Sequence, residues 1–154
     1  MKKLAILVPV LALSLTGCGT ETAKTGTINC TLSTNDVVNG YSLESSYVIN
    51  YTGDYVDNVE TKEEVTSESE DILEYFETTL NDTYSATSKA YGGYTYTITN
   101  ENGKVISDVT IDYGKMNIDQ YVKDQPTLKS YVEDGKLLVD GIKAIYESMG
   151  ATCE

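Results

Sequence analysis

The chain has 154 residues, with 24 Asp and Glu against 11 Lys, a formal net charge of −13, 13 Tyr, 3 Cys, and neither His nor Arg. This length suits one domain. The missing His excludes Ser-His-Asp and Cys-His catalysis and His-ligated metal sites. The acidity argues against a nucleic-acid partner, because affinity for nucleic acid comes mainly from neutralising phosphates.

The first residues have the pattern of a secretory signal. Lys2 and Lys3 precede an apolar run from Leu4 to Leu15. At 1.5 Å per residue this run spans about 18 Å, well short of the roughly 30 Å core of a bilayer. A buried helix is the alternative, but the run has no amphipathic pattern. The run ends in Leu-Thr-Gly-Cys at 15–18, which resembles the lipobox of bacterial lipoproteins.

The lipobox resemblance implies a membrane anchor. It implies cleavage before Cys18, a diacylglycerol on the Cys18 sulfur and an acyl chain such as palmitate on the new amine. Two or three such chains anchor stably, since each buried methylene contributes about 0.8 kcal/mol. We therefore expect a signal peptide at 1–17, a lipidated tether at 18–26 and a single domain at 27–154. The domain would be lipid-anchored to the cell membrane and would face the extracytoplasmic side.

Two cysteines remain once Cys18 carries the lipid. Cys30 lies in the first expected strand and Cys153 one residue from the C-terminus. Disulfides persist outside the membrane, and an even remainder favours one bond. Closing so long a loop would stabilise the fold by about 5 kcal/mol through chain entropy. The alternative is two separate thiols, one of them buried.

Three strands are expected first. The stretch 27–34 is rich in β-branched residues. Alternate residues from Tyr41 to Tyr51 are mostly apolar, which predicts a strand with one buried face. Gly53-Asp54 marks a hairpin, and 55–65 predicts a third strand whose apolar face includes Asp57 and Val59. Its charged half indicates the edge of a sheet.

A helix is expected from Glu70 to Lys89. Ser67 with Glu70 fits a capping box, and acidic residues in the first turn suit the helix dipole. Gly92-Gly93 ends the helix. Its apolar stripe consists of Ile72, Leu73, Phe76, Leu80 and Tyr84.

The remaining chain predicts a hairpin and a last helix. The strand from Tyr94 to Thr99 leads through the hairpin signal Asn102-Gly103 to a return strand ending at Tyr113. A connector follows, with helical turns near 118–122 and 127–133. The last helix carries Leu138, Ile142, Ile145 and Met149 at helical spacing and stops at Gly150.

The element order β-β-β-α-β-β-α indicates the α+β class. We expect an antiparallel sheet of about five strands with two main helices packed on one face.

No catalytic motif is present. The sequence contains no G-x-S-x-G, G-x-G-x-x-G, C-x-x-C or H-E-x-x-H. We therefore expect no enzyme, no catalytic residue, no cofactor and no metal. The acid-rich stretch from Glu60 to Glu77 offers carboxylates to a hard cation. It lacks the ligand spacing of an EF-hand, so a solvated strand end and helix face are the preferred interpretation.

The tyrosines provide the candidate ligand contacts. Tyr91, Tyr94 and Tyr96 flank the double glycine. Thirteen Tyr against one Phe favours rings with an apolar body and a wet polar tip. On an exposed sheet face such rings can stack on a sugar or contact a peptide. Cross-strand pairing and core packing is the alternative and the more common role.

Four features extend over most of the mature chain: Cys30-Thr31, the hairpin at Gly53-Asp54, the acid-rich helix after Val65, and the closing segment from Ile145 to Cys153. Together they resemble the YehR-like family of small bacterial lipoproteins. The resemblance implies an α+β fold and supplies no catalytic residue.

These observations predict a membrane-anchored extracytoplasmic lipoprotein. Its domain would bind or scaffold an envelope protein or a glycan, without catalysis. Two alternatives stay open: a lipoprotein that captures a solute for a transporter, and an envelope enzyme that uses carboxylates or Tyr. A pocket lined by converging polar groups would favour solute capture, whereas an exposed Tyr face would favour the protein or glycan partner.

Overall fold

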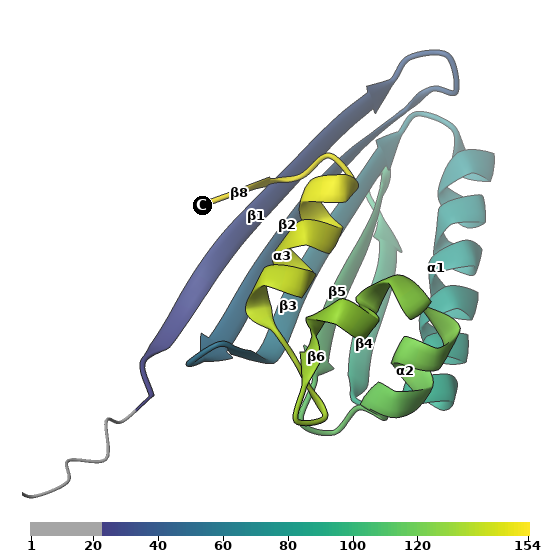
Figure 1. Cartoon of the computed structure of the whole chain (residues 1–154). Coiled ribbons are helices and arrows are strands. Elements are labelled where there is room, and N and C mark those ends of the chain that lie inside the picture. Colours follow the sequence, from purple (N-terminus) through teal and green to yellow (C-terminus); the bar gives the residue numbers. More distant parts are fainter. Residues whose placement is uncertain (1–22) are drawn as a thin grey trace, which may run out of the picture.

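The computed structural model describes residues 23–154, so the predicted signal peptide and the lipobox cysteine Cys18 lie outside the described residues. The main feature is a six-stranded antiparallel sheet with strand order β4-β5-β3-β2-β1-β8 (Figure 1). Helices α1, α2 and α3 pack on one face of it (Figure 1). The predicted α+β class and the order of the main elements are confirmed.

The first three strands form two successive hairpins: β1 (Thr25–Asp36), β2 (Tyr41–Thr52) and β3 (Tyr55–Ser67). β1 begins two residues inside the segment 18–26 that we expected to be a tether. The prediction of β3 as an edge strand is wrong, because β3 pairs with β2 on one side and β5 on the other. Its charged residues Glu60 and Lys62 instead alternate with buried ones and point to the face opposite the helices.

A bulge in β3 changes which residues face the core. Asn50 pairs with Asn58, whereas the next residue Tyr51 pairs with Val56, which leaves Asp57 as the extra residue. As a result Val56 is buried and Asp57 is exposed. We had predicted Asp57 on the same face as Val59, and the bulge is the reason that this is wrong.

Helix α1 (Glu70–Tyr91) follows β3 and ends at Gly92, whose φ of 71° favours glycine. The predicted capping box is absent. Ser69 is the N-cap and makes no side-chain capping hydrogen bond. Ser67 is the last residue of β3, and its hydroxyl donates to the carbonyl of Gly40 at 2.7 Å. The side chain is thereby engaged with the neighbouring hairpin.

The strands β4 (Tyr94–Glu101) and β5 (Lys104–Asp112) form the predicted hairpin. Asn102 and Gly103 have φ values of 54° and 76°, as a two-residue turn of this kind requires. The side chains of Tyr94, Tyr96 and Ile98 face the helices, and the threonines between them face away.

The C-terminal third is built from short elements. It contains α2 (Ile118–Asp124), the 3₁₀ helix η1 (Pro126–Tyr131), a small hairpin of β6 (Val132–Glu133) and β7 (Lys136–Leu137), and α3 (Val139–Ser148). The predicted helical turn at 127–133 is correct only as far as Tyr131, because residues 132–133 form β6 and the chain turns back at Asp134-Gly135 to pair with β7. In α3, Ile142 is buried as predicted, but Met149 is 51% exposed because the helix ends before it.

The last strand, β8 (Thr152–Cys153), adds a sixth strand beside β1. Cys30 and Cys153 are paired residues of these two strands and form a disulfide with an S–S distance of 2.02 Å. Glu154 and Asn29 also exchange two backbone hydrogen bonds of 2.9 Å. The two ends of the domain are therefore joined by both a covalent bond and a strand pairing.

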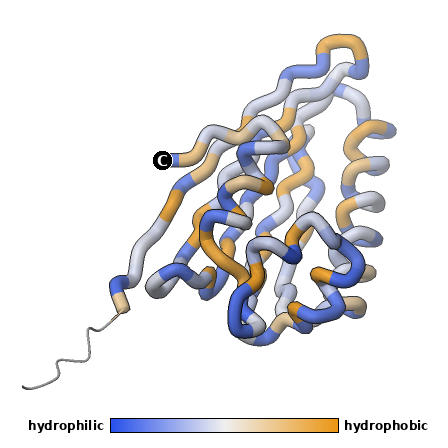
Figure 2. The backbone as a smooth tube through the Cα atoms, in the orientation of Figure 1, coloured by the Kyte–Doolittle hydropathy of each residue, from blue (hydrophilic) through white to orange (hydrophobic). Residues whose placement is uncertain are grey.

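The two faces of the sheet differ in character. The covered face supplies most of the core, with Ile49, Val59 and Val105 at 0% exposure. The other face, called the bare face below, carries mostly Thr, Ser, Asn and charged side chains. At the tip of the β1–β2 hairpin, Val37 and Val38 are exposed, in the orange stretch at the top of Figure 2. Among residues 23–154, no helix has the length and apolar character needed to span a membrane.

Candidate functional site

A cleft of about 390 Å³ opens on the covered face of the sheet. Its floor comes from β2, β3 and β5, and its walls come from α1 and α3. α2 contributes Tyr121 at one end of the cleft, where it packs beside α1 (Figure 1). α1 and α3 cover different parts of the sheet, and the cleft lies in the space between these two helices.

Seven of the residues that line the cleft are tyrosines, and they come from six parts of the chain. Tyr47 and Tyr146 stack with their ring centroids 4.1 Å apart, and Tyr91 meets Tyr121 edge to face at 5.1 Å. Four of the seven are buried and three are half-buried. The set is Tyr47, Tyr84, Tyr91, Tyr94, Tyr113, Tyr121 and Tyr146.

Burial keeps these phenols protonated. It raises the pKa of the Tyr47 and Tyr146 hydroxyls above the usual range and that of Tyr113 well above it. The pKa of Tyr84 is raised by burial and also by the neighbouring carboxylate of Glu63. At neutral pH the phenols therefore present hydroxyl groups and ring faces without formal charge.

Glu63 of β3 is the one acidic residue that lines the cleft. Its Oε2 accepts hydrogen bonds from the Tyr84 hydroxyl at 2.7 Å and from the Ser107 hydroxyl at 3.2 Å. These two donors fix the orientation of the carboxylate on the floor. Neither Lys nor Arg is among the lining residues. None of the salt bridges within residues 23–154 includes Glu63.

The structure places two of the three predicted contact residues at the cleft. Tyr91 and Tyr94 line it, whereas Tyr96 lies outside it with its ring 5.6 Å from that of Tyr84. All three pack against the main core, on the helix side of the sheet. The exposed Tyr sheet face that we considered for a sugar or peptide is therefore not where these rings lie.

Other lining residues were not singled out from the sequence. Tyr113 was expected only as a residue of the return strand and Tyr146 only as part of the closing segment, and Tyr121 had no expected role. Glu63 was counted only as part of the acid-rich stretch. Side chains of a strand alternate between its two faces, so Glu63 shares a face with Thr61 and Val65, which are buried. This alternation is the signal that could have assigned Glu63 to the covered face. Within residues 23–154 no group of three or more His, Cys, Asp or Glu is arranged to hold a metal ion.

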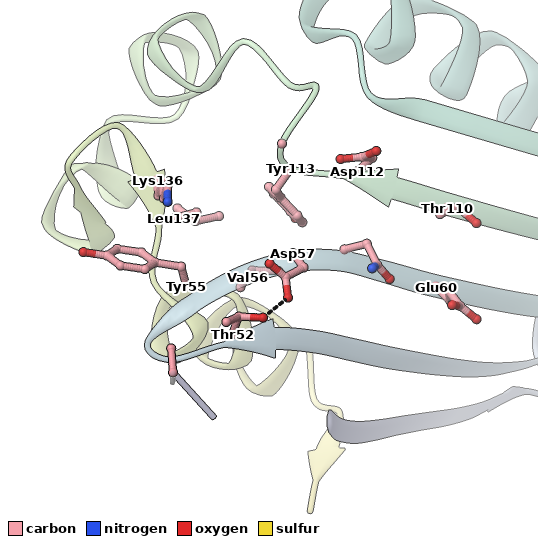
Figure 3. A pocket seen from close by; sticks show the side chains of 13 residues that line it. Thr52, Tyr55, Val56, Asp57, Glu60, Thr110, Asp112, Tyr113, Lys136 and Leu137 are labelled. Carbon is pink, nitrogen blue, oxygen red and sulfur yellow. Dashed lines mark hydrogen bonds between the residues drawn. The ribbon is translucent and has the colours of Figure 1, made fainter. Parts of the chain in front are cut away.

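A second, wider hollow of about 720 Å³ lies at the end of the sheet, between β3, β5 and the β6–β7 hairpin (Figure 3). Thr52 donates a hydrogen bond of 2.7 Å to Asp57 there, and the Lys136 ammonium lies 5.2 Å from the centre of the Tyr55 ring. Figure 3 shows these groups spread around an open rim rather than converging on one point. Since small-molecule sites are mostly apolar with a few convergent polar groups, the Tyr-lined cleft is the better candidate.

The fold and the cleft define a small α+β domain in which helices cover one face of an antiparallel sheet and enclose an aromatic cleft. No protein-family model and no curated protein matches the sequence. The NMR structure of the Escherichia coli YehR protein is similar, with a TM-score of 0.53 at 19% identity over 85% of this chain and 91% of that chain.

The NMR structure of a protein from Streptococcus pneumoniae TIGR4 is also similar, with a TM-score of 0.50 at 10% identity over 100% of this chain and 96% of that chain. The expected likeness to YehR is thus confirmed at the level of the fold. At these identities the chemistry of the cleft has to be argued from this chain's own residues.

Proposed function

We propose that the protein is a lipid-anchored, extracytoplasmic binding protein that holds a small molecule in the cleft between α1 and α3 without transforming it. The observation that carries the proposal is the convergence of seven tyrosines and one carboxylate on a cavity of about 390 Å³. This volume falls within the range of ordinary ligand sites, about 300–1,000 Å³.

Converging polar groups favour solute capture among the alternatives drawn from the sequence. A protein or glycan partner on an exposed Tyr face has less support, because the rings of Tyr91, Tyr94 and Tyr96 lie on the helix side of the sheet. The raised pKa values of the lining phenols argue against a phenolate base or nucleophile at neutral pH. A binding protein that delivers its ligand to a transporter fits this arrangement.

The location part of the proposal rests on the lipobox at 15–18. The acidic domain would be repelled by anionic headgroups, so attachment depends on lipid at Cys18. We expect Cys18→Ala to abolish incorporation of labelled palmitate in growing cells, whereas Cys153→Ala, a matched loss of one cysteine, stays labelled. Equal labelling of the two variants would contradict the anchor.

The binding part can be tested by blocking the cleft. Thr87 lines it from α1, whereas its neighbour Ala86 is exposed and does not. Two aromatic probes, benzyltrimethylammonium and dimethyl benzyl carbinol, are titrated by NMR into the full chain in a non-ionic detergent. We expect saturable shifts at cleft residues with at least one of the two probes. Thr87→Phe should weaken this binding by about tenfold or more, equivalent to about 1.4 kcal/mol.

Ala86→Phe is the matched control, since it adds the same ring one residue along the same helix and should bind like the wild type. The free spectra of both variants report whether each has folded. Saturable shifts that are unchanged in Thr87→Phe, or no saturable shift from either probe, would overturn the binding proposal.

A further inference from the structure

We infer that the ligand of the cleft is an organic cation, a small ammonium compound. This inference rests on the proposed function, because it names the ligand class for the same site. It follows from three observations: the charge of the cleft floor, the aromatic walls and the placement of lysines elsewhere in the fold.

The floor of the cleft carries one formal charge, and it is negative. Glu63 contributes it, and no lining residue supplies a positive charge in return. Glu63 is half-buried, and an opposite charge nearby would compensate for the hydration that its carboxylate gives up there. The hydroxyls of Tyr84 and Ser107 both hydrogen-bond to Oε2, so they fix the carboxylate without neutralising it. A cationic ligand would complete this site.

Glu64, the residue next to Glu63 in β3, is an example of a carboxylate that has a partner within the protein. Glu64 points to the bare face and forms a salt bridge with Lys104 of β5. The other salt bridges within residues 23–154 likewise use surface carboxylates, those of Asp112 and Glu147. Glu64 and Glu63 are both half-buried, but only Glu64 has a lysine partner within residues 23–154, so the charge of Glu63 remains available to a ligand that enters the cleft.

The walls suit a cation as well. The face of a tyrosine ring carries partial negative charge and attracts ammonium groups, more strongly when water is excluded. Seven such rings line the cleft. An anion in the cleft would meet Glu63 with no lysine among the lining residues to offset its charge. The net charge of the chain, −13, adds a field that draws cations toward the protein.

The test compares two probes of closely similar shape. Benzyltrimethylammonium and dimethyl benzyl carbinol share a benzyl group and a branched end, but only the first is charged. We expect the cation to bind the wild-type chain about tenfold more tightly than the carbinol in the NMR titration. Raising the salt concentration should weaken binding of the cation and leave binding of the carbinol unchanged.

Glu63→Gln keeps an oxygen acceptor for Tyr84 and Ser107 and removes the charge. This variant should bind the cation about tenfold more weakly and should bind the carbinol as the wild type does. Glu60→Gln is the matched control, because Glu60 lies on the bare face of the same strand and its loss changes the net charge equally. It should bind the cation like the wild type.

Each other result decides against the inference. Equal affinity of the wild type for the two probes would overturn the inference of a cationic ligand and would leave the proposed small-molecule site standing. Equal weakening by Glu60→Gln and Glu63→Gln would assign the effect to the overall field and not to the cleft. If neither probe gives saturable shifts, the proposed function fails together with the inference. Should Glu63→Gln not fold, the comparison of the two probes on the wild type still decides.

Discussion

The two faces of the central sheet are made by the same strands and have opposite chemistry. On β3, Glu63 faces the helices and accepts hydrogen bonds from Tyr84 and Ser107. The next residue, Glu64, faces away and pairs with Lys104. Adjacent glutamates thus have different surroundings because strand side chains alternate between faces. An acid-rich stretch is therefore not one feature, since each carboxylate has to be assigned to its face.

The largest expected difference between the faces is in stability. Ile49 of β2 is fully buried on the covered face, whereas Ile106 of β5 lies half-buried on the bare face. We expect Ile49→Ala to lower the free energy of unfolding by about 3 kcal/mol, because it leaves a cavity in the core. Ile106→Ala should cost less than about 1 kcal/mol. Urea unfolding monitored by circular dichroism measures both, and equal losses would mean that the bare face is covered in solution.

A smaller effect is expected from the ion pair on the bare face. The Lys104 side chain is about two-fifths exposed in its salt bridge with Glu64. We expect Glu64→Gln to lower the free energy of unfolding by less than about 1 kcal/mol, since solvent and salt screen such pairs. The loss should shrink further in high salt. A loss above about 2 kcal/mol that persists in high salt would contradict the assignment of Glu64 to a solvated face.

Most of the fold could be predicted because its main elements are long. The strand from Tyr41, the helix from Glu70 and the hairpin at Asn102-Gly103 each carry a pattern over many residues or a specific turn signal. The elements that were missed are short. β7 and β8 have two residues each, which is too few to show a period. β8 exists through its pairing with β1, a contact between residues more than a hundred positions apart.

The cleft could be predicted only in part. Tyr91 and Tyr94 stand out because they lie beside the double glycine. Tyr47 and Tyr146, although they stack on each other, lie far apart in the sequence. Glu63 looks like any member of an acidic run until the central position of β3 is known. The packing of α1 and α3 on one face brings these residues together and was predicted. The separation of the two helices, which leaves the cleft between them, is set by tertiary packing and by no local pattern.

The disulfide between Cys30 and Cys153 has a consequence for proteolysis. It joins two residues that are 123 positions apart and so closes the chain from Cys30 to Cys153 into a ring. A protease that cuts once inside the ring, for example at the exposed valines of the β1–β2 tip, produces two fragments that stay joined through sulfur. A single nick therefore opens the ring but releases nothing, and any anchor at the N-terminus continues to hold both parts.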